Sequence, residues 1–139
     1  MANKEQEPGL IGVVADIIKV EKEYEIAIET ALGGSIQNIV TDNENTAKRM
    51  IEFLKRNKFG RATFLPLTSM RGSGGIRNEE ALREPGVIGL ANTLVHVESR
   101  FVGLAEQLLG RTIVVDHIDH GIAIARKYHQ TLRLVTLEG

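Results

Sequence analysis

The densest group of side chains that could do chemistry is the run Asp116-His117-Ile118-Asp119-His120. Carboxylate and imidazole groups bind divalent metals, and a site needs at least three of them to converge on one ion. The run follows an apolar strand pattern and opens a helical one, where an aspartate also serves to bond the free amides of the first turn. We therefore expect Asp116 and Asp119 to cap and charge the start of a helix, and we assign no metal ligand here.

No other motif in the sequence predicts catalysis. The sequence contains no cysteine, which excludes thiol catalysis, disulfides and thiolate metal sites. It has no Gly-x-Ser-x-Gly or His-Glu-x-x-His motif, and Gly33-Gly34 ends a helical pattern instead of opening one as phosphate-binding loops do. We predict no cofactor. A small-ligand-binding α/β regulatory domain or an enzyme fragment stays open as the alternative, because catalytic triads assemble from distant positions.

Basic residues gather in and just after the second helical pattern. They are Lys48, Arg49, Lys55, Arg56, Lys58 and Arg61. The group is either a solvated helix face balanced by neighbouring glutamates or a weak patch for the phosphate backbone of DNA. The formal net charge of the chain is −1, so no global field draws it to nucleic acid. If DNA binds, weakly and without sequence preference, we expect it at Lys55, Arg56, Lys58 and Arg61.

The composition is that of an ordinary globular protein. Of its 139 residues, 42% are hydrophobic and 25% are charged. No apolar run reaches the roughly 20 residues needed to span a bilayer, and the first nine residues, MANKEQEPG, have no apolar signal core. Together with the absence of cysteine, these features predict a cytoplasmic protein with no membrane partner.

An internal repeat organises the chain. The segment Pro8–Gly33 aligns without gaps with Pro85–Gly110, a shift of 77 positions, and nine of the 26 aligned pairs are identical. Farther on, the segment 39–42 (IVTD) matches the segment 113–116 (IVVD). Such a repeat indicates two similar units that fold and pack together. We place the first unit at residues 8–67, a connecting loop at 68–86 and the second unit at 87–139.

Each unit has the order strand, helix, strand, helix, strand, which predicts an α/β fold with mixed sheets. In the first unit we expect strands over 11–18, 36–41 and 62–67 and helices over 22–32 and 43–57. A capping box at Thr41-Asp42-Asn43-Glu44 should begin the second of these helices. In the second unit we expect strands over 87–97, 112–115 and 132–137 and helices over 99–109 and 116–128. A helical turn near 79–83 is expected within the connecting loop.

The stretch 27–67 resembles the hinge domain of bacterial SMC (structural maintenance of chromosomes) proteins, the chromosome-condensing ATPases. The matching motifs are Leu32-Gly33-Gly34, the strand end Val40-Thr41-Asp42, and GRATFLPL at 60–67. The second unit adds matching pieces at Phe101–Gly110 and Arg133–Gly139. The resemblance runs from about Pro8 to Gly139 and covers nearly the whole chain.

The resemblance implies a module for homodimerisation, with two pseudo-symmetric subdomains and two coiled-coil arms to join. It acts in chromosome condensation and segregation at the nucleoid, and some hinges also bind DNA. ATP hydrolysis would lie in head domains outside this chain, so the chain itself is not expected to be an enzyme. Two hinges associate through sheet edges and glycines that allow close backbone approach. On this basis we predict that the interface contains Gly33, Gly34, Ser35, Leu134, Thr136 and Gly139.

One family signature falls largely outside this sequence. The signature is a glycine, six residues, a second glycine, three residues and two further glycines, and only its first member, Gly139, is present. We therefore expect dimerisation of this chain to be weaker than, or altered from, what the resemblance implies. Physical reasoning supports a dimer independently, because open strand edges in two similar units can pair with each other across a two-fold axis.

Overall fold

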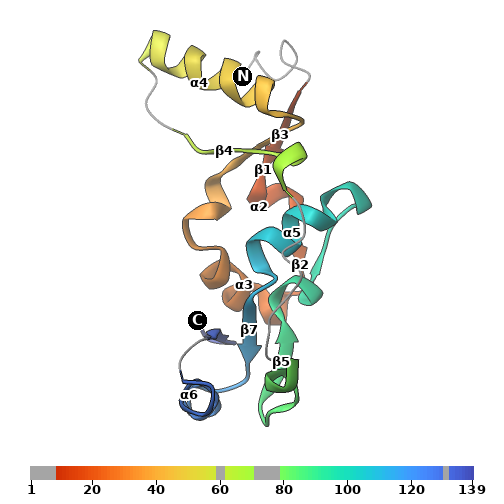
Figure 1. Ribbon diagram of the computed structural model, residues 1–139, viewed down its shortest axis with the longest axis vertical. Coiled ribbons are helices and arrows are strands. Elements are labelled where there is room, and N and C mark those ends of the chain that lie inside the picture. The colour runs from red at the N-terminus through yellow and green to blue at the C-terminus, as the bar shows by residue number, and fades with distance from the viewer. Residues whose placement is uncertain (1–8, 59–61, 71–78, 130–131) are drawn as a thin grey trace.

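The computed structural model describes residues 9–58, 62–70, 79–129 and 132–139 (Figure 1). The symbol η marks a 3-10 helix. The first unit contains β1 (Leu10–Val13), α2 (Val14–Ile17), β2 (Lys19–Val20), η1 (Lys22–Tyr24), α3 (Glu25–Leu32), η2 (Gly33–Gln37), β3 (Ile39–Thr41), α4 (Glu44–Asn57), β4 (Phe64–Pro66) and η3 (Leu67–Ser69). The second contains η4 (Glu79–Arg83), β5 (Val87–Leu90), η5 (Ala91–Leu94), β6 (Val95–His96), η6 (Ser99–Phe101), α5 (Val102–Leu109), β7 (Thr112–Val115), α6 (Ile118–Lys127) and β8 (Arg133–Thr136).

The two units build sheets of the same topology. One three-stranded sheet has the order β1-β3-β4 and the other has the order β5-β7-β8. In each sheet the first pair is antiparallel and the second is parallel. Even the irregularities correspond, because the register shifts between Leu10 and Gly12 in β1 and between Val87 and Gly89 in β5. The predicted α/β fold with mixed sheets and two similar units is confirmed.

The units meet across a local two-fold axis. Strands β2 and β6 form an antiparallel ribbon in which Lys19 pairs with His96, its own equivalent 77 positions later. The equivalent helices α3 and α5 also contact each other. Residue sizes are exchanged at the buried positions of these helices, with Ala27 equivalent to Leu104 and Ile28 to Ala105. The two units therefore place side chains of different size at equivalent buried positions.

The main hydrophobic core crosses the boundary between the units. Its buried members from the first unit are Val14, Ile18, Ala27, Ile28, Ala31, Leu32 and Val40, and those from the second are Ala91, Phe101, Leu104, Leu109, Val114 and Val135. A smaller cluster lies in the second unit alone and consists of Ala81, Ile113, Val115 and Ile124. Neither unit therefore encloses the main core by itself. No helix in the described residues is long and apolar enough to cross a membrane.

The long apolar stretches expected as single strands are broken. The stretch 11–18 leaves the sheet after Val13, because the amide of Ile18 donates to the carbonyl of Val14 at 3.0 Å and closes a helical turn. The stretch 87–97 breaks at the equivalent place, into η5. Both breaks place a residue of the shared core, Val14 or Ala91, fully inside. Alternating apolar pattern alone could not reveal this turn, since both conformations bury the same side chains.

The helix caps also differ from the prediction. The cap of α4 is Asn43, whose side chain accepts the amide of Thr46 at 3.0 Å, and Glu44 instead accepts a bond from Ser69 at 2.7 Å. The prediction of a capping box formed by Thr41 and Glu44 is therefore wrong. The N-cap of α6 is His117, without a side-chain cap bond, so Asp116 is not the cap either. It stands one residue earlier and accepts the amide of His117.

The remaining elements lie where the sequence placed them, with shorter ends. The strand 112–115 and the turn near 79–83 have the expected bounds, and the helices 22–32 and 99–109 begin with a 3-10 turn. The strand expected over 36–41 starts only at Ile39, because η2 occupies 33–37. Part of the connecting loop, including Gly72–Gly75, lies outside the described residues, so the unit boundaries stay a prediction.

Replacing Leu104 by alanine tests the shared core. This side chain is fully buried, so its truncation should lower the free energy of unfolding by about 2–5 kcal/mol. Because the core spans both units, calorimetry and circular dichroism should still show one cooperative transition, at a lower temperature. Val102→Ala is the control, since Val102 lies exposed on the same helix. Two separate transitions would show that the units fold independently.

Candidate interface at the sheet edges

Each three-stranded sheet has two edge strands, β1 and β4 in the first sheet and β5 and β8 in the second. Among the described residues, β4 and β8 each have a strand neighbour on one side only. The free side of such a strand presents unpaired amides and carbonyls and is a template for another strand. Strand β4 ends in Pro66, which has no amide to donate. Strand β8 contains no proline, so it offers the longer ladder.

Helix α6 is tied along one flank to the segment that enters β5. At its start, Nδ1 of His120 lies 2.7 Å from Oδ1 of Asp116, and the amide of Asp116 donates to the carbonyl of Gly86 at 2.8 Å. At its end, Nζ of Lys127 and the hydroxyl of Tyr128 donate to Oε2 of Glu84, at 2.7 and 2.9 Å. These contacts hold both ends of the helix against the segment that precedes β5.

The bonds shift the ionisation of the groups that make them. The hydrogen bond from His120 is the largest cause that lowers the pKa of Asp116. The bond from Lys127, and then that from Tyr128, lower the pKa of Glu84. The same pairing raises the pKa of Lys127, and burial together with the bond to Glu84 raises the pKa of Tyr128. Glu84 and Lys127 are therefore held as an ion pair at neutral pH.

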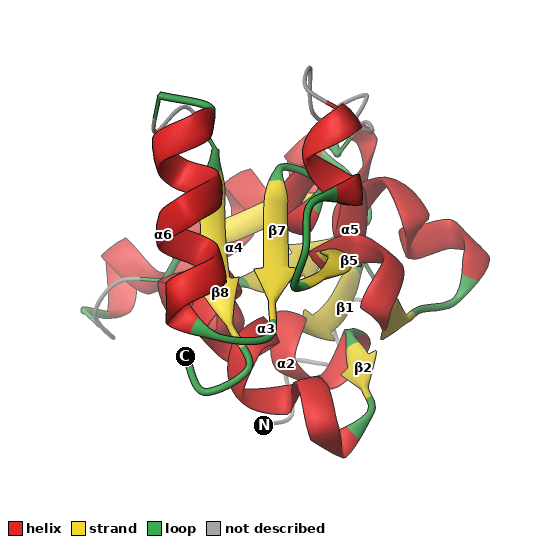
Figure 2. Ribbon diagram, turned by 90° about the horizontal axis from the view of Figure 1, so that it is seen from below, coloured by secondary structure: helices red, strands yellow, loops and turns green. Residues whose placement is uncertain are grey.

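The opposite flank of α6 carries two exposed isoleucines. Ile118 and Ile122 are 65% and 45% exposed, and their spacing of four places them on one side of the helix. The other flank faces β5, and β5 and β8 lie on opposite sides of β7. The isoleucines are therefore on the β8 side, where Figure 2 shows α6 beyond the last strand. Ile118 and Ile122 thus form an apolar surface next to the edge strand β8, which we call the shelf.

A groove lies beside the first sheet, between η2, α4 and the residues that precede β4. Its volume is about 630 Å³. It is lined by Gly34, Gln37, Asn38, Ile51, Leu54, Lys55, Ala62 and Thr63. Asn38 and Thr63 directly precede β3 and β4, so the groove is at the amino ends of these parallel strands. Small-ligand sites in open α/β sheets lie at the carboxyl ends, which speaks against the small-ligand alternative.

Most exposed large apolar side chains lie around these two places. Among the described residues, Ile26, Ile51, Val102, Ile118 and Ile122 belong to this class. Ile51 lines the groove, the two isoleucines of α6 flank β8, and Ile26 lies beside the chain at Gly139, where an added Cβ would be 3.4 Å away. Only Val102 lies elsewhere, on α5. The exposed apolar side chains of the described residues therefore lie mainly at the groove and beside β8.

The predicted interface residues fall in two groups. Gly34 lines the groove, and Gly33 and Ser35 lie next to it in η2. Leu134 and Thr136 lie on β8, and Gly139 follows it. The side chain of Leu134 packs into the cluster under α6, so this residue can offer its backbone to a partner but little of its side chain. The structure does not test the assignment, which stays a prediction.

Sequence reasoning missed the three isoleucines of α4 and α6. The helical periodicity puts Ile51 in the buried stripe of α4, yet this residue is 39% exposed. Ile118 and Ile122 stand outside the buried positions of α6, which are Gly121 and Ile124. An apolar pair four residues apart, away from the buried stripe, is the signal that could have identified them.

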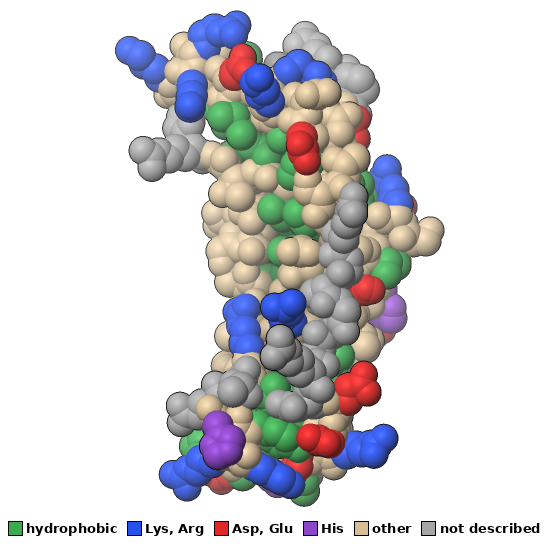
Figure 3. Space-filling model, in the orientation of Figure 1, with side chains coloured by type: hydrophobic (Ala, Val, Ile, Leu, Met, Phe, Trp, Pro, Cys, Tyr) green, Lys and Arg blue, Asp and Glu red, His purple; other side chains and the backbone are tan. Residues whose placement is uncertain are grey.

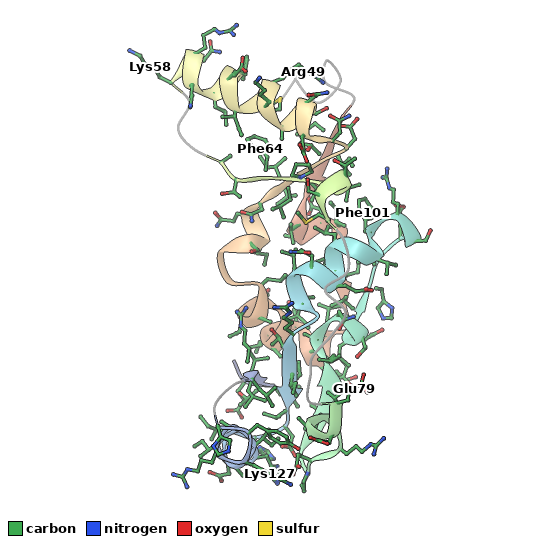
Figure 4. The ribbon with its side chains drawn as sticks, viewed as in Figure 1. Arg49, Lys58, Phe64, Glu79, Phe101 and Lys127 are labelled. Atoms are coloured by element: carbon green, nitrogen blue, oxygen red, sulfur yellow. The ribbon has the colours of Figure 1, made fainter. Side chains whose placement is uncertain are left out.

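Basic side chains gather at both ends of the molecule. Figure 3 shows them over α4 at one end and near α6 at the other, and Figure 4 labels Arg49, Lys58 and Lys127 at these ends. Lys55, Arg56 and Lys58 of the predicted DNA patch are exposed, whereas Arg61 lies outside the described residues. Arg49 donates to the hydroxyl of Thr46 at 3.1 Å, so it belongs to the start of α4.

The carboxylate and imidazole run does not form a metal centre in the part of the chain that the structure describes. No group of three or more suitable ligands converges there. Asp116 instead bonds His120, and the ring of His117 lies 6.4 Å from that of His120 between centroids. In the first unit, Asp42 makes the equivalent contact with the hydroxyl of Thr46 at 2.6 Å. The run therefore forms the strand-to-helix turn of the second unit, and its Asp116–His120 contact is equivalent to the Asp42–Thr46 contact of the first unit.

Replacing Glu84 by glutamine tests the tie that holds α6. Because its pKa is lower in the folded chain than in the unfolded chain, Glu84 stabilises the fold above the ordinary carboxyl pKa, and this contribution disappears as the pH falls through the folded value. Glu84→Gln should lower the melting temperature by a few degrees at neutral pH and by much less near about pH 3. Glu79→Gln is the control. Equal melting temperatures of Glu84→Gln and the parent at neutral pH would contradict the tie.

Comparison with known proteins agrees with this architecture. The family model described as "SMC proteins Flexible Hinge Domain" matches residues 7–125. Among curated relatives, the chromosome partition protein Smc of Lactiplantibacillus plantarum is 41% identical over 100% of this chain, and that of Bacillus subtilis is 38% identical over 98%. The chain spans only 12% of the length of each of these relatives.

Two solved structures have the same fold. An asymmetric dimer of the Geobacillus stearothermophilus SMC hinge domain superimposes with a TM-score of 0.90 at 38% identity and covers 98% of this chain and 56% of its own. The Pyrococcus furiosus SMC hinge domain gives 0.81 at 30% identity, with 99% and 69% coverage. With the duplicated unit, the shared core and the family match over 7–125 in agreement, the chain belongs to the family of SMC flexible hinge domains.

Proposed function

We propose that this chain is the homodimerisation hinge of a chromosome partition protein. The observation that carries the proposal is the position of the exposed isoleucines, with Ile51 in the groove beside the first sheet and Ile118 and Ile122 next to the edge strand β8. An apolar side chain beside an unpaired strand gains when another protein covers both, because apolar area and open amides leave water together. The relative from Geobacillus stearothermophilus is described as an asymmetric dimer, which supports self-association of this chain.

The duplicated architecture gives the dimer a simple geometry. One copy presents a groove beside β4 in its first unit and an open β8 with an apolar shelf in its second. If the β8 edge of each copy docks at the β4 side of the other, one two-fold operation covers the β4 and β8 edges of both copies. In this arrangement Gly33, Gly34 and Ser35 of one copy approach Leu134, Thr136 and Gly139 of the other.

The role is mechanical and not catalytic. The hinge joins two arms of the longer protein and acts in chromosome condensation and segregation at the nucleoid, in the cytoplasm. The ATPase activity of the parent protein belongs to head domains outside this chain. The names of the curated relatives, which are chromosome partition proteins, support this part of the proposal.

Charged substitutions at the isoleucines test the dimer. Ile122→Asp on the shelf or Ile51→Asp in the groove would bury a carboxylate at a seam, so each should weaken dimerisation by about 100-fold. Sedimentation equilibrium over a range of concentrations measures the dissociation constant. Val102→Asp is the matched control, because Val102 is similarly exposed but lies away from both edges. A parent chain that stays monomeric at the highest concentration, alone and when extended through the full glycine signature, would overturn the proposal.

A weak DNA-binding surface on α4 is a second candidate function. Its support is the basic group at the end of the helix, where Lys55 and Arg56 lie in the last turn and Lys58 follows them. Such a group can bind the phosphate backbone without reading bases. The net charge of −1 limits the interaction to this local patch.

Neutral substitutions at the patch test DNA binding apart from dimerisation. In Arg56→Gln/Lys58→Gln, affinity for a mixed-sequence duplex should fall, and the slope of log affinity against log salt should decrease by about 0.9 for each phosphate that the protein no longer neutralises. Fluorescence anisotropy at several salt concentrations measures both. Lys55 is left intact because it also lines the groove, and Lys22→Gln serves as the control on another element. Unchanged affinity and slope would exclude this patch.

A further inference from the structure

A single side chain connects the open strand of the second unit to the first unit. Nη2 of Arg133, at the start of β8, donates to the backbone carbonyl of Ala31 in α3 at 2.8 Å. The two residues are 102 positions apart in the chain. Arg133 shares its face of β8 with Val135, which is buried in the core cluster that also contains Ala31 and Leu32. The guanidinium is therefore held against the end of α3 by the packing beside it.

The end of α3 has a specific need for this bond. The last four carbonyls of a helix have no partner within the helix, and the helix dipole makes this end negative. The amide of Gly33 satisfies the carbonyl of Glu29, and Arg133 satisfies that of Ala31. A cation at this position is doubly favoured, because it supplies a donor and a positive charge.

The first unit has a different residue at the position equivalent to Arg133. The strand registers pair Ile39 with Phe64 and Ile113 with Leu134, so Thr63 occupies in the first unit the position of Arg133. A threonine side chain is too short for the same reach. The connection between the two units through this position is thus a feature of β8 alone.

Beyond Ala31 the chain leads straight into the groove. Leu32 is followed by Gly33 with φ of 53° and by η2, from which Gly34 and Gln37 line the groove. In Figure 1 this segment lies above α3, and β8 lies below it. The order from one candidate edge to the other is therefore β8, Arg133, the end of α3, and the groove.

We propose that Arg133 is a positioning residue that couples the two edges of the hinge. It sets the end of α3, and with it the groove lining in η2, according to the position of β8. The proposal rests on the proposed function insofar as it treats these edges as the two seams of a dimer. When the partner copy binds at β8, Arg133 positions the groove so that it can bind the β8 edge of the same partner. The two contacts of the dimer therefore form together.

Hydrogen exchange of the intact chain, at a concentration where it is monomeric, tests the positioning role without the dimer. In Arg133→Gln the amides of Gly34 to Asn38 should exchange about tenfold faster, because the bond removed involves a charged donor. The amides of β7 should be unaffected. Arg133→Lys keeps the charge and a donor and should restore most of the protection, and it also serves if the glutamine variant does not fold. Arg126→Gln, on α6 and away from α3, is the control.

Sedimentation of the same variants then tests the coupling. Arg133→Gln should raise the dissociation constant of the dimer about tenfold, although the side chain faces α3 within its own copy. Unchanged exchange at Gly34 to Asn38 in a folded Arg133→Gln variant overturns the positioning role. Faster exchange with unchanged dimer affinity overturns the coupling. Faster exchange in a chain that never dimerises overturns the proposed function and leaves Arg133 as a positioning residue only.

Discussion

The antiparallel ribbon between β2 and β6 is the constraint on which the rest of the structure depends. Its pairing of Lys19 with His96 sets each unit against its own equivalent, and this fixes α3 beside α5 and merges the interiors into one core. Once the centre is shared, each unit can cover only the inner part of its sheet. Each sheet keeps two edge strands among the described residues, and the edges β4 and β8 lie towards opposite ends of the body (Figure 1). Open edges are thus a result of how the units join.

The repeat keeps its frame but differs in its outer layer. In both units an aspartate next to a glycine stabilises the turn before the second helix. Asp42 bonds the hydroxyl of Thr46 in the first unit, and Asp116 bonds the imidazole of His120 in the second. In the second unit, Ala81 and Leu82 of η4 close a separate cluster under α6. Helix α4 buries only Thr46 and Ala47. One end therefore presents a groove and the other a shelf. The groove of one copy is better suited to the shelf of a second copy than to the groove of that copy.

The sequence predicted the duplicated frame, the two main helices of each unit and the resemblance to SMC hinges. It did not predict the breaks after Val13 and Leu90, because an apolar run buries the same residues as a strand or as a turn. It placed the cap of α4 at Thr41, whereas in the structure the side chain of Asn43 accepts the amide of Thr46 and Glu44 accepts a bond from Ser69. Ile51, Ile118 and Ile122 could not be recognised as surface residues, since exposure is decided by flanking contacts such as that of Glu84 with Lys127. The prediction that Gly33 ends a helix is confirmed.

The exchanged sizes at Ala27 with Leu104 and at Ile28 with Ala105 have an evolutionary consequence. After a gene duplication, recombination between the two copies tends to make them identical again. In this protein such a correction would put leucine at both 27 and 104, or alanine at both, in one shared core, and the added or lost volume would cause a clash or a void. Selection should therefore preserve divergence between the halves at these positions, and a substitution in one half should be accompanied by its reciprocal in the other.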